Sequence, residues 1–206
     1  MKKYLLLTIA FMAAFSSCLK DRVSTATSGP VVVGDRKLIH YWSFNSGSDS
    51  TSLAIPDTTI GGGTIHYAFT DTGHADAVSP GSSLNLRMGA DSGSGLRVRI
   101  PFKYWTLYIP TTGYKQPIVQ FVVERSNSGP TTNDISYTID GQNFITTGLS
   151  ATSVTLGTTW ALFSLDFSAI PSVDDNPKFA IKFNNSTTAT GGNNRYDNIS
   201  VDAFPK

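Results

Sequence analysis

The chain has 206 residues, of which 15% are charged, and 16 Lys and Arg against 15 Asp and Glu leave a formal net charge of +1. This balance gives no electrostatic footprint for nucleic acid, so we expect no nucleic-acid partner. One cysteine excludes an internal disulfide framework, and three dispersed histidines favour no histidine-based metal site. With 40% hydrophobic residues, the chain can bury the core of one ordinary domain.

The N-terminus has the pattern of an export signal. Residues 1–3 are basic at two positions, residues 4–15 form an apolar stretch too short to span a bilayer as a mature helix, and the small residues 16–17 precede Cys18. This ending resembles a bacterial lipobox, which implies a signal peptide at 1–17 and a mature chain that begins with lipidated Cys18. The alternative is an ordinary secretory signal that happens to contain a cysteine.

Residues 18–36 are rich in Ser, Thr, Gly and Val and show no helical period, so we expect a flexible tether between the lipid anchor and a folded domain at 37–206. The Lys20-Asp21 pair resembles the short charged signal by which Bacteroidetes lipoproteins reach the outer face of the outer membrane. The sequence therefore suggests an outer-membrane lipoprotein at the cell surface. The alternative is that both charges are merely solvated.

From residue 37 onward the pattern is that of an all-β domain. No stretch has helical apolar spacing, whereas many short alternating runs are separated by Gly, Pro, Asn and Asp. Ten to twelve short strands around one core predict a two-sheet antiparallel β-sandwich. The candidate strands are 37–44, 64–69, 83–88, 96–102, 104–109, 118–125, 135–139, 144–147, 153–156, 160–167, 178–184 and 195–203.

A tight hairpin is expected at Asp140-Gly141, between the runs 135–139 and 142–145. Both turn residues tolerate positive φ, as two-residue hairpin turns require.

Several motifs together resemble one family, the extracellular jelly-roll domains of Bacteroidetes secreted proteins and lipoproteins, which are related to carbohydrate-binding modules and the galactose-binding-like fold. The resemblance covers nearly all of 37–203 and implies a jelly-roll sandwich. It does not identify a ligand, because a shared fold does not determine function. The motifs are Trp42-Ser43-Phe44-Asn45, Thr111-Thr112-Gly113-Tyr114, Glu124-Arg125-Ser126, residues 137–141, residues 174–179 and residues 192–201.

The resemblance also implies a structural Ca²⁺ site. In calcium-bearing relatives, the aspartate that opens the final strand binds the ion together with oxygens that follow the first strand, which here are Asp197 and Asn45. Alternation along the last strand places Arg195 and Asp197 on the same face as the apolar residues 199–203. The alternative is that Asp197 pairs with Arg195 or caps loop amides without metal.

The residues that best suit ligand contact are the aromatic residues Tyr104, Tyr108 and Tyr114, with Arg97 and Arg99 nearby in sequence. Tyr104 and Tyr108 alternate with apolar residues, so they face outward if the latter fill the core. Exposed rings stack on the apolar faces of sugars, and arginine binds hydroxyls or carboxylates. The alternative is an aromatic and arginine ladder that only covers a sheet.

No nucleophile elbow, phosphate loop, dinucleotide fingerprint or zinc-protease motif occurs in the sequence. We therefore expect a non-catalytic binding domain, with a glycan or surface polymer as ligand. The alternatives are a structural or adhesion protein that binds another envelope protein, and a glycan-active enzyme with a divergent site.

Overall fold

The structure is a computed structural model, and it describes residues 27–28, 35–68, 74–100, 104–185, 189 and 191–206. The predicted signal peptide at 1–17 and Cys18 lie outside the described residues. None of the helices in the described part of the chain is long and apolar enough to cross a membrane.

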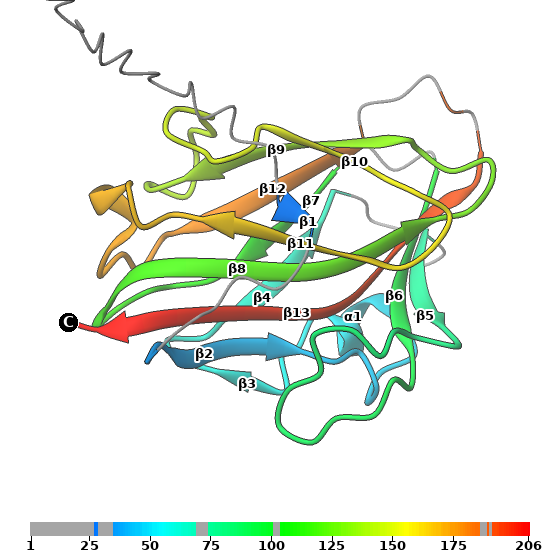
Figure 1. Cartoon of the computed structure of the whole chain (residues 1–206), viewed down its shortest axis with the longest axis horizontal. Helices are drawn as coiled ribbons and strands as arrows, with labels where there is room; N and C mark the ends of the chain where they lie inside the picture. Colours follow the sequence, from blue (N-terminus) through cyan, green and yellow to red (C-terminus); the bar gives the residue numbers. More distant parts are fainter. Residues whose placement is uncertain (1–26, 29–34, 69–73, 101–103, 186–188, 190) are drawn as a thin grey trace, which may run out of the picture.

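The domain consists of two antiparallel sheets packed face to face, which confirms the predicted all-β sandwich (Figure 1). Strands from distant parts of the sequence lie side by side, as Figure 1 shows for green β8, red β13 and blue β2. The larger sheet, here sheet A, contains β1 (Thr27–Ser28), β2 (Lys37–Trp42), β3 (Thr58–Thr59), β5 (Ala75–Val78), β6 (Gly95–Arg99), β8 (Tyr114–Arg125), β11 (Ala161–Asp166) and β13 (Asn193–Pro205). Sheet B contains β4 (Thr64–Tyr67), β7 (Tyr104–Tyr108), β9 (Thr132–Thr138), β10 (Ser153–Thr155) and β12 (Ala180–Asn185).

The strand order is that of a jelly roll. Sheet A contains the neighbours β11-β8-β13-β2, and sheet B contains β10-β9-β12-β7, with β4 added at its edge. From β7 to β9 the chain passes from one sheet to the other at each step, and it does so again from β10 to β13. Two interleaved four-stranded sheets of this order define the jelly roll, and the helices are limited to the short α1 (Ser50–Leu53) and η2 (Pro171–Val173) in the described chain.

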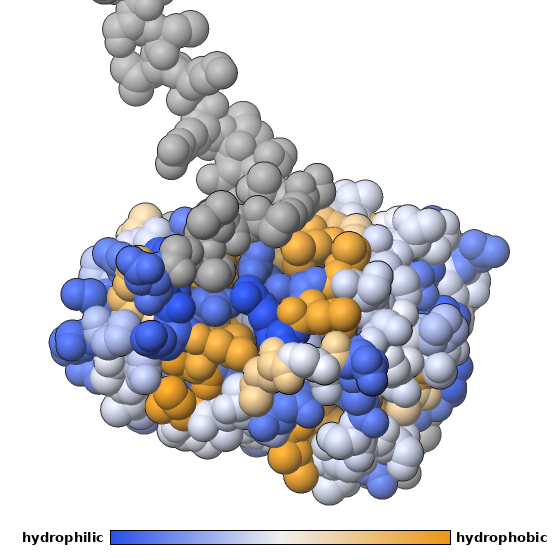
Figure 2. Space-filling model, turned by 60° about the horizontal axis from the view of Figure 1, so that its bottom comes forward, coloured by the Kyte–Doolittle hydropathy of each residue, from blue (hydrophilic) through white to orange (hydrophobic). Residues whose placement is uncertain are grey.

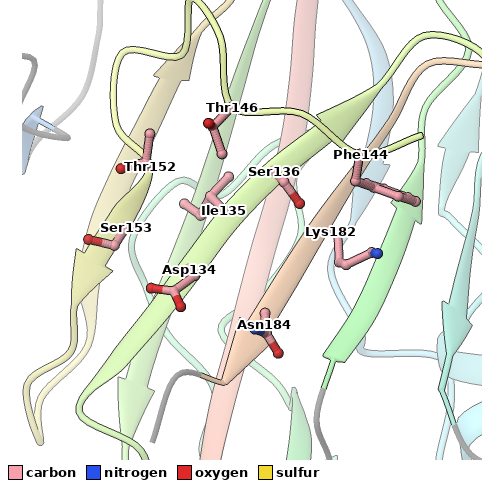
Figure 3. A pocket seen from close by; sticks show the side chains of 9 residues that line it. All are labelled: Asp134, Ile135, Ser136, Phe144, Thr146, Thr152, Ser153, Lys182 and Asn184. Carbon is pink, nitrogen blue, oxygen red and sulfur yellow. The ribbon is translucent and has the colours of Figure 1, made fainter. Parts of the chain in front are cut away.

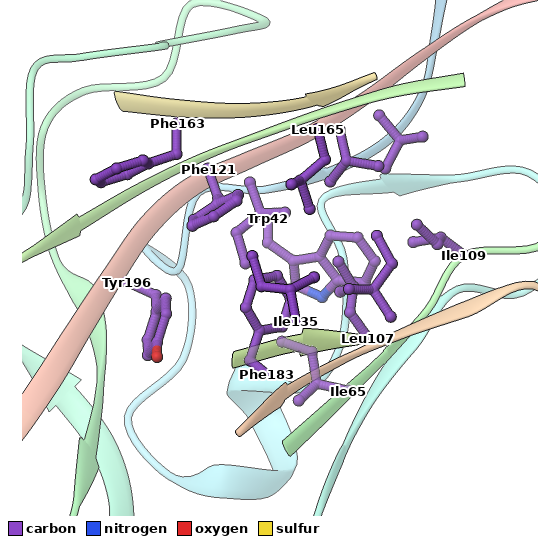
Figure 4. Packing of buried hydrophobic residues seen from close by; sticks show 14 of the residues in the cluster. Trp42, Ile65, Leu107, Ile109, Phe121, Ile135, Phe163, Leu165, Phe183 and Tyr196 are labelled. Carbon is purple, nitrogen blue, oxygen red and sulfur yellow. The ribbon is translucent and has the colours of Figure 1, made fainter. Parts of the chain in front are cut away.

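Aromatic rings fill the space between the sheets (Figure 4). The Trp105 ring of β7 stacks on the Phe183 ring of β12, with centroids 4.4 Å apart, and meets the Tyr196 ring of β13 edge-on at 4.9 Å. Phe121 of β8 lies edge-on to Phe183 at 5.1 Å. Because these four residues come from both sheets, the aromatic contacts fix how one sheet sits on the other.

Part of the predicted tether is in a strand. Thr27–Ser28 pairs with Ser164 and Phe163 of β11 and so extends the edge of sheet A. Just before β2, the Arg36 guanidinium lies 4.2 Å from the centroid of the Phe204 ring, and its Nε donates to the Gln116 carbonyl at 3.0 Å. Unpaired backbone groups at a sheet edge offer such pairing to any nearby chain.

The prediction of a strand at 83–88 is wrong. This segment lies in the loop of residues 79–94 between β5 and β6, and both Asn85 and Met88 have φ of 56°. Its apolar side chains face solvent, with 39%, 38% and 66% exposure for Leu84, Leu86 and Met88. The alternation is present, but the polar residues Asn85 and Arg87 face the protein, because they bind polar groups on the outer face of sheet A.

The chain reverses at Asp140-Gly141 as predicted, but through a wider loop. The isolated bridge that closes it joins Tyr137 to Ile145, so the predicted strand at 144–147 is only a bridge. Asp140 accepts hydrogen bonds from the amides of Gln142 and Asn143 at 2.8 and 2.7 Å. These bonds lower the pKa of Asp140 well below its ordinary range and stabilise the loop in place of a two-residue turn.

Candidate functional site

The outer face of sheet B carries polar and aromatic side chains on a regular scaffold. Strand registers align these side chains in rows across the sheet, since residues paired across neighbouring strands lie on the same face. The first row, from β10 to β7, is Ser153, Asp134, Asn184 and Tyr104, and the second, from β9 to β4, is Ser136, Lys182, Thr106 and His66.

A shallow pocket of about 600 Å³ is hollowed into this face (Figure 3). Phe144 and Lys182 lie at one end of it, and Asp134 and Ser153 lie toward the other. Hydroxyl, amide and carboxylate groups predominate in its lining, which can donate to and accept from a ligand rich in hydroxyls. The lining residues are Asp134, Ile135, Ser136, Phe144, Thr146, Thr152, Ser153, Lys182 and Asn184.

Lys182 is held between two aromatic rings. Its Nζ lies 3.7 Å from the centroid of Phe144 and 4.8 Å from that of Tyr104. Both contacts are cation–π interactions, in which the ring face attracts the ammonium. Partial burial lowers the pKa of Lys182 below its ordinary value.

Tyr104 and Tyr108 occupy the face predicted for them. Trp105 and Leu107, which alternate with them in β7, are fully buried in the core. The Tyr104 ring contacts Lys182, and the Tyr108 ring lies 4.6 Å from His66 at an angle of 51°. Each tyrosine therefore already packs against a neighbour on the sheet.

The other predicted contact residues lie elsewhere, so the five residues do not form one surface. Tyr114 begins β8 in sheet A and is partly buried against the core. Arg97 and Arg99 are in β6 of sheet A, where their Nη2 atoms lie 2.6 and 2.7 Å from the Asp76 carboxylate. Proximity in sequence was misleading, because residues 95–99 and 104–108 belong to different sheets.

Asp197 does not share a face with the apolar residues that follow it. The register with β8 shifts between Asp197 and Ser200, and Asn198 has φ of 45°. This bulge changes the alternation, so Tyr196 and Ile199 both point into the core. The alternative pairing of Asp197 with Arg195 is not formed among the described residues, since Arg195 binds Glu124 at 2.8 Å.

The Asp197 carboxylate caps the loop of residues 79–94. Its Oδ2 accepts from the Ser82 amide at 2.5 Å and its Oδ1 from the Asn198 amide at 2.8 Å. Burial raises the pKa of Asp197 to about 7. The predicted second calcium ligand, Asn45, binds the other end of the same loop, where its Oδ1 accepts from the Ser94 amide at 2.7 Å.

Where Asp197 and Asn45 bind this loop, several oxygens that a cation could use lie close together, among them the Asp197 carboxylate. A Cβ at Gly81 would lie 2.1 Å from the Ser92 carbonyl oxygen and 2.6 Å from Asp197 Oδ2, so these two oxygens converge on the same point. Within the described ranges, no three His, Cys, Asp or Glu side chains are grouped closely enough to hold a metal ion. Calcium here would depend on neutral oxygens such as those of Ser92 and Asn45.

A second hollow of about 550 Å³ lies where α1 meets β4, the edge strand of sheet B. Its lining is more apolar, and it shares His66 with the outer face of sheet B. The lining residues are Ser50, Thr51, Ala54, Ile55, Thr64, Ile65, His66 and Tyr67.

His40 belongs to the interior. Its Nε2 lies 2.8 Å from the Pro110 carbonyl and its Nδ1 lies 2.9 Å from Thr59 Oγ1. Because a carbonyl can only accept, Nε2 carries the proton of the neutral ring. Burial lowers the pKa of His40 to about 4.

Sequence reasoning missed Lys182, Phe144, Asp134 and Asn184 as site residues. Lys182 could have been found by asking which residues share the outer face with Tyr104. Phe144 could not, because it reaches Lys182 from the long loop after Tyr137.

No family model matches the sequence, and no curated protein matches it. Among solved structures, the chain is similar to the K1 cleaved adhesin domain of Lys-gingipain from Porphyromonas gingivalis W83, with 15% identity and a TM-score of 0.44 over 78% of this chain and 95% of that one. It is also similar to the xylan-binding domain CBM22-1 of Xyn10C from Paenibacillus barcinonensis, with 11% identity and a TM-score of 0.43 over 83% and 97% of the two chains. A third is the enzymatically active domain of tailspike protein 4 from bacteriophage CBA120, with 16% identity and a TM-score of 0.44 over 69% of this chain, which spans only 19% of that one. At these identities the likeness concerns the β-sandwich fold alone.

Proposed function

We propose that this chain is a non-catalytic glycan-binding domain of a bacterial cell-envelope lipoprotein, and that its ligand lies on the outer face of sheet B. The observation that carries the proposal is the pocket of about 600 Å³, in which polar side chains of β9, β10 and β12 lie beside the aromatic ring of Phe144. Sugars present hydroxyls around a weakly apolar ring face, and this combination of groups complements both.

Asp134 and Asn184 are the central hydrogen-bonding pair of the site. They face each other across β9 and β12, and both line the pocket. The Asp134 carboxylate accepts only, whereas the Asn184 amide both donates and accepts. Together they can bind two neighbouring hydroxyls of one sugar.

Binding without hydrolysis is favoured by the carboxylates of the site. Glycoside hydrolysis commonly requires two carboxyl groups on opposite sides of the scissile bond. Among the described residues that line the pocket, Asp134 is the only one with a carboxylate.

The anchoring part of the proposal depends on Cys18. A diacylated or triacylated cysteine would hold the domain stably on a membrane, since one acyl chain alone binds only marginally. In the native bacterium, the mass of the N-terminal peptide should include acyl chains on Cys18, and Cys18→Ser should release the protein from the membrane fraction. If the N-terminal peptide carries no acyl chains, the proposed lipid anchor is wrong, whereas the proposed glycan binding is unaffected.

The binding proposal is tested by a glycan array followed by calorimetric titration of each hit. Asp134→Ala and Asn184→Ala should each weaken binding at least about 10-fold, the effect expected for a lost hydrogen bond to a well-placed polar group. Asn127→Ala, an exposed asparagine away from the pocket, is the matched control. If all three variants bind a glycan as tightly as the wild type does, the ligand binds outside this pocket.

A second candidate function is adhesion to another envelope protein, favoured by the side chains that the loop of residues 79–94 displays. Figure 2, turned so that the bottom of Figure 1 comes forward, shows separate hydrophobic patches among polar residues. Leu84, Leu86 and Met88 are exposed on a segment that Asn85 and Arg87 hold in place. A photo-crosslinker at Met88 should then capture one discrete protein in cells, and Leu86→Ser should abolish that product.

A further inference from the structure

We propose that the sugar bound in this pocket is acidic, and that its carboxylate is held by the Nζ of Lys182. The inference rests on the proposed glycan-binding function and deepens it, since it names the chemical class of the ligand. It comes from the surroundings of this one cation.

Lys182 has no acidic partner among the described residues. The carboxylate–cation pairs of the described chain involve Arg87, Arg97, Arg99, Arg195 and Lys206. The contacts of the Lys182 ammonium are instead with the faces of Phe144 and Tyr104. Ring faces attract a cation but carry no net charge, so the positive charge remains available to a ligand.

The ammonium is also fixed in position. Lys182 is in β12, between β9 and β7, opposite Ser136 and Thr106. One ring contact comes from its own sheet and the other from the loop above it, so the side chain is held from two sides. A lysine ordered in this way loses less conformational entropy when it binds an anion than a free surface lysine does.

The pocket has a positive end and a negative end, which orients the ligand. Lys182, beside Phe144, forms the positive end. Asp134, one row away and opposite Asn184, forms the negative end (Figure 3). Two residues along a strand correspond to roughly 6.8 Å, which is enough to separate an acidic group from the hydroxyls of the same sugar. The sugar carboxylate therefore faces Lys182 and its hydroxyls face Asp134 and Asn184, because the reverse orientation would bring two carboxylates together.

The experiment compares glycans that differ only in the carboxyl group. Oligogalacturonate, oligomannuronate and oligoglucuronate are each titrated beside their carboxyl-reduced neutral forms. At least one acidic form should bind roughly 10-fold or more tightly than its neutral form, the range of a hydrogen bond to a charged group. Raising the salt concentration should weaken the acidic form more than the neutral one.

Variants of Lys182 test whether this residue causes the preference for acidic over neutral glycans. Lys182→Met keeps the length and apolar stem of the side chain and should abolish the preference, whereas Lys182→Arg should keep it. Lys115→Met, at an exposed lysine of sheet A, is the matched control and should change nothing. The melting temperature of each variant shows whether it is folded.

The results distinguish a failure of the acidic specificity from a failure of the proposed glycan binding. Equal binding of acidic and neutral forms, or a preference that survives Lys182→Met, would overturn the acidic specificity and leave glycan binding in place. No binding of any acidic or neutral glycan, on the array or in titration, would overturn both.

Discussion

Asn85 and Asn198 are joined by a hydrogen bond of 2.7 Å from the Asn85 Nδ2 to the Asn198 carbonyl, although 113 residues separate them. The same Nδ2 lies 3.1 Å from Ser200 Oγ. In return, the Asn198 Nδ2 donates to the carbonyls of Ser82 and Leu84, each at 2.9 Å. These two asparagines thus pin the loop of residues 79–94 to the bulge in β13.

This arrangement predicts that a polar residue of the loop matters more for stability than its apolar neighbour. Asn85→Ala leaves the buried carbonyl of Asn198 without its partner and puts alanine at a φ of 56°. We expect the free energy of unfolding to fall by about 2 kcal/mol or more. Leu84→Ala, the control, should cost less than about 1 kcal/mol, because Leu84 is partly exposed. Denaturant titration measures both free energies of unfolding. A larger loss for Leu84→Ala would contradict the arrangement in which the polar side chains of this loop face the protein and the apolar ones face solvent.

Within the strands, the inward and outward faces could be predicted from the sequence wherever the alternation continued without a break. In β7, the alternating pattern correctly assigned Trp105 to the core and Tyr104 to the outside. In β13 the same reasoning failed after Asp197, because one extra residue at the bulge reverses the faces. A bulge depends on pairing with neighbouring strands, so nothing in the local sequence indicates it.

The candidate site could be predicted only in part, for a related reason. The outward direction of Tyr104 follows from period two within one strand. Its neighbours depend on which strands pair, and β7 pairs with β12 and β4 rather than with β6. Lys182 therefore takes the place beside Tyr104 that sequence proximity had suggested for Arg97 and Arg99.

Adjacent residues of β7 should differ sharply in their effect on stability. Trp105→Ala removes a ring that stacks on Phe183 at 4.4 Å and leaves a cavity between the sheets. We expect a loss of about 3 to 5 kcal/mol in the free energy of unfolding. Tyr104→Ala, on the opposite face, should cost no more than about 1 kcal/mol. Comparable losses for the two variants would mean that the core does not lie between these sheets.

Calcium should stabilise the protein through Asp197 if the oxygens near Gly81 and Gly93 bind a cation. A bound Ca²⁺ offsets the burial of the ionised Asp197 carboxylate, and a ligand that binds only the native state raises the melting temperature. At pH 8, calcium at one hundred times its Kd should raise Tm by roughly 5 to 10 °C.

Asp197→Asn distinguishes specific stabilisation by calcium from a nonspecific effect of salt on the melting temperature. The variant keeps the size of the side chain and one acceptor oxygen but should lose the response to calcium. A melting curve that is the same in excess chelator and in excess calcium would reject the metal site and leave amide capping as the role of Asp197.

Buried His40 should make stability depend on pH below neutrality. Its pKa is about 4 in the folded protein against an ordinary value of 6.5, so between these values the unfolded chain binds the proton more readily. The stability that neutral His40 contributes is complete above pH 6.5 and is lost as the pH falls toward 4. Between pH 7.5 and pH 5 the loss should be about 2 kcal/mol.

Asp197 acts in the opposite direction, which decides how the His40 effect is measured. Because the pKa of Asp197 is raised from 3.8 to about 7, its contribution to stability is complete below pH 3.8 and is lost as the pH rises to 7. The two groups partly cancel in the wild type, so the test is the difference between wild type and His40→Gln at each pH. That difference should shrink by about 2 kcal/mol from pH 7.5 to pH 5. A constant difference for His40→Gln would mean that this ring is protonated in the folded protein as readily as in the unfolded chain.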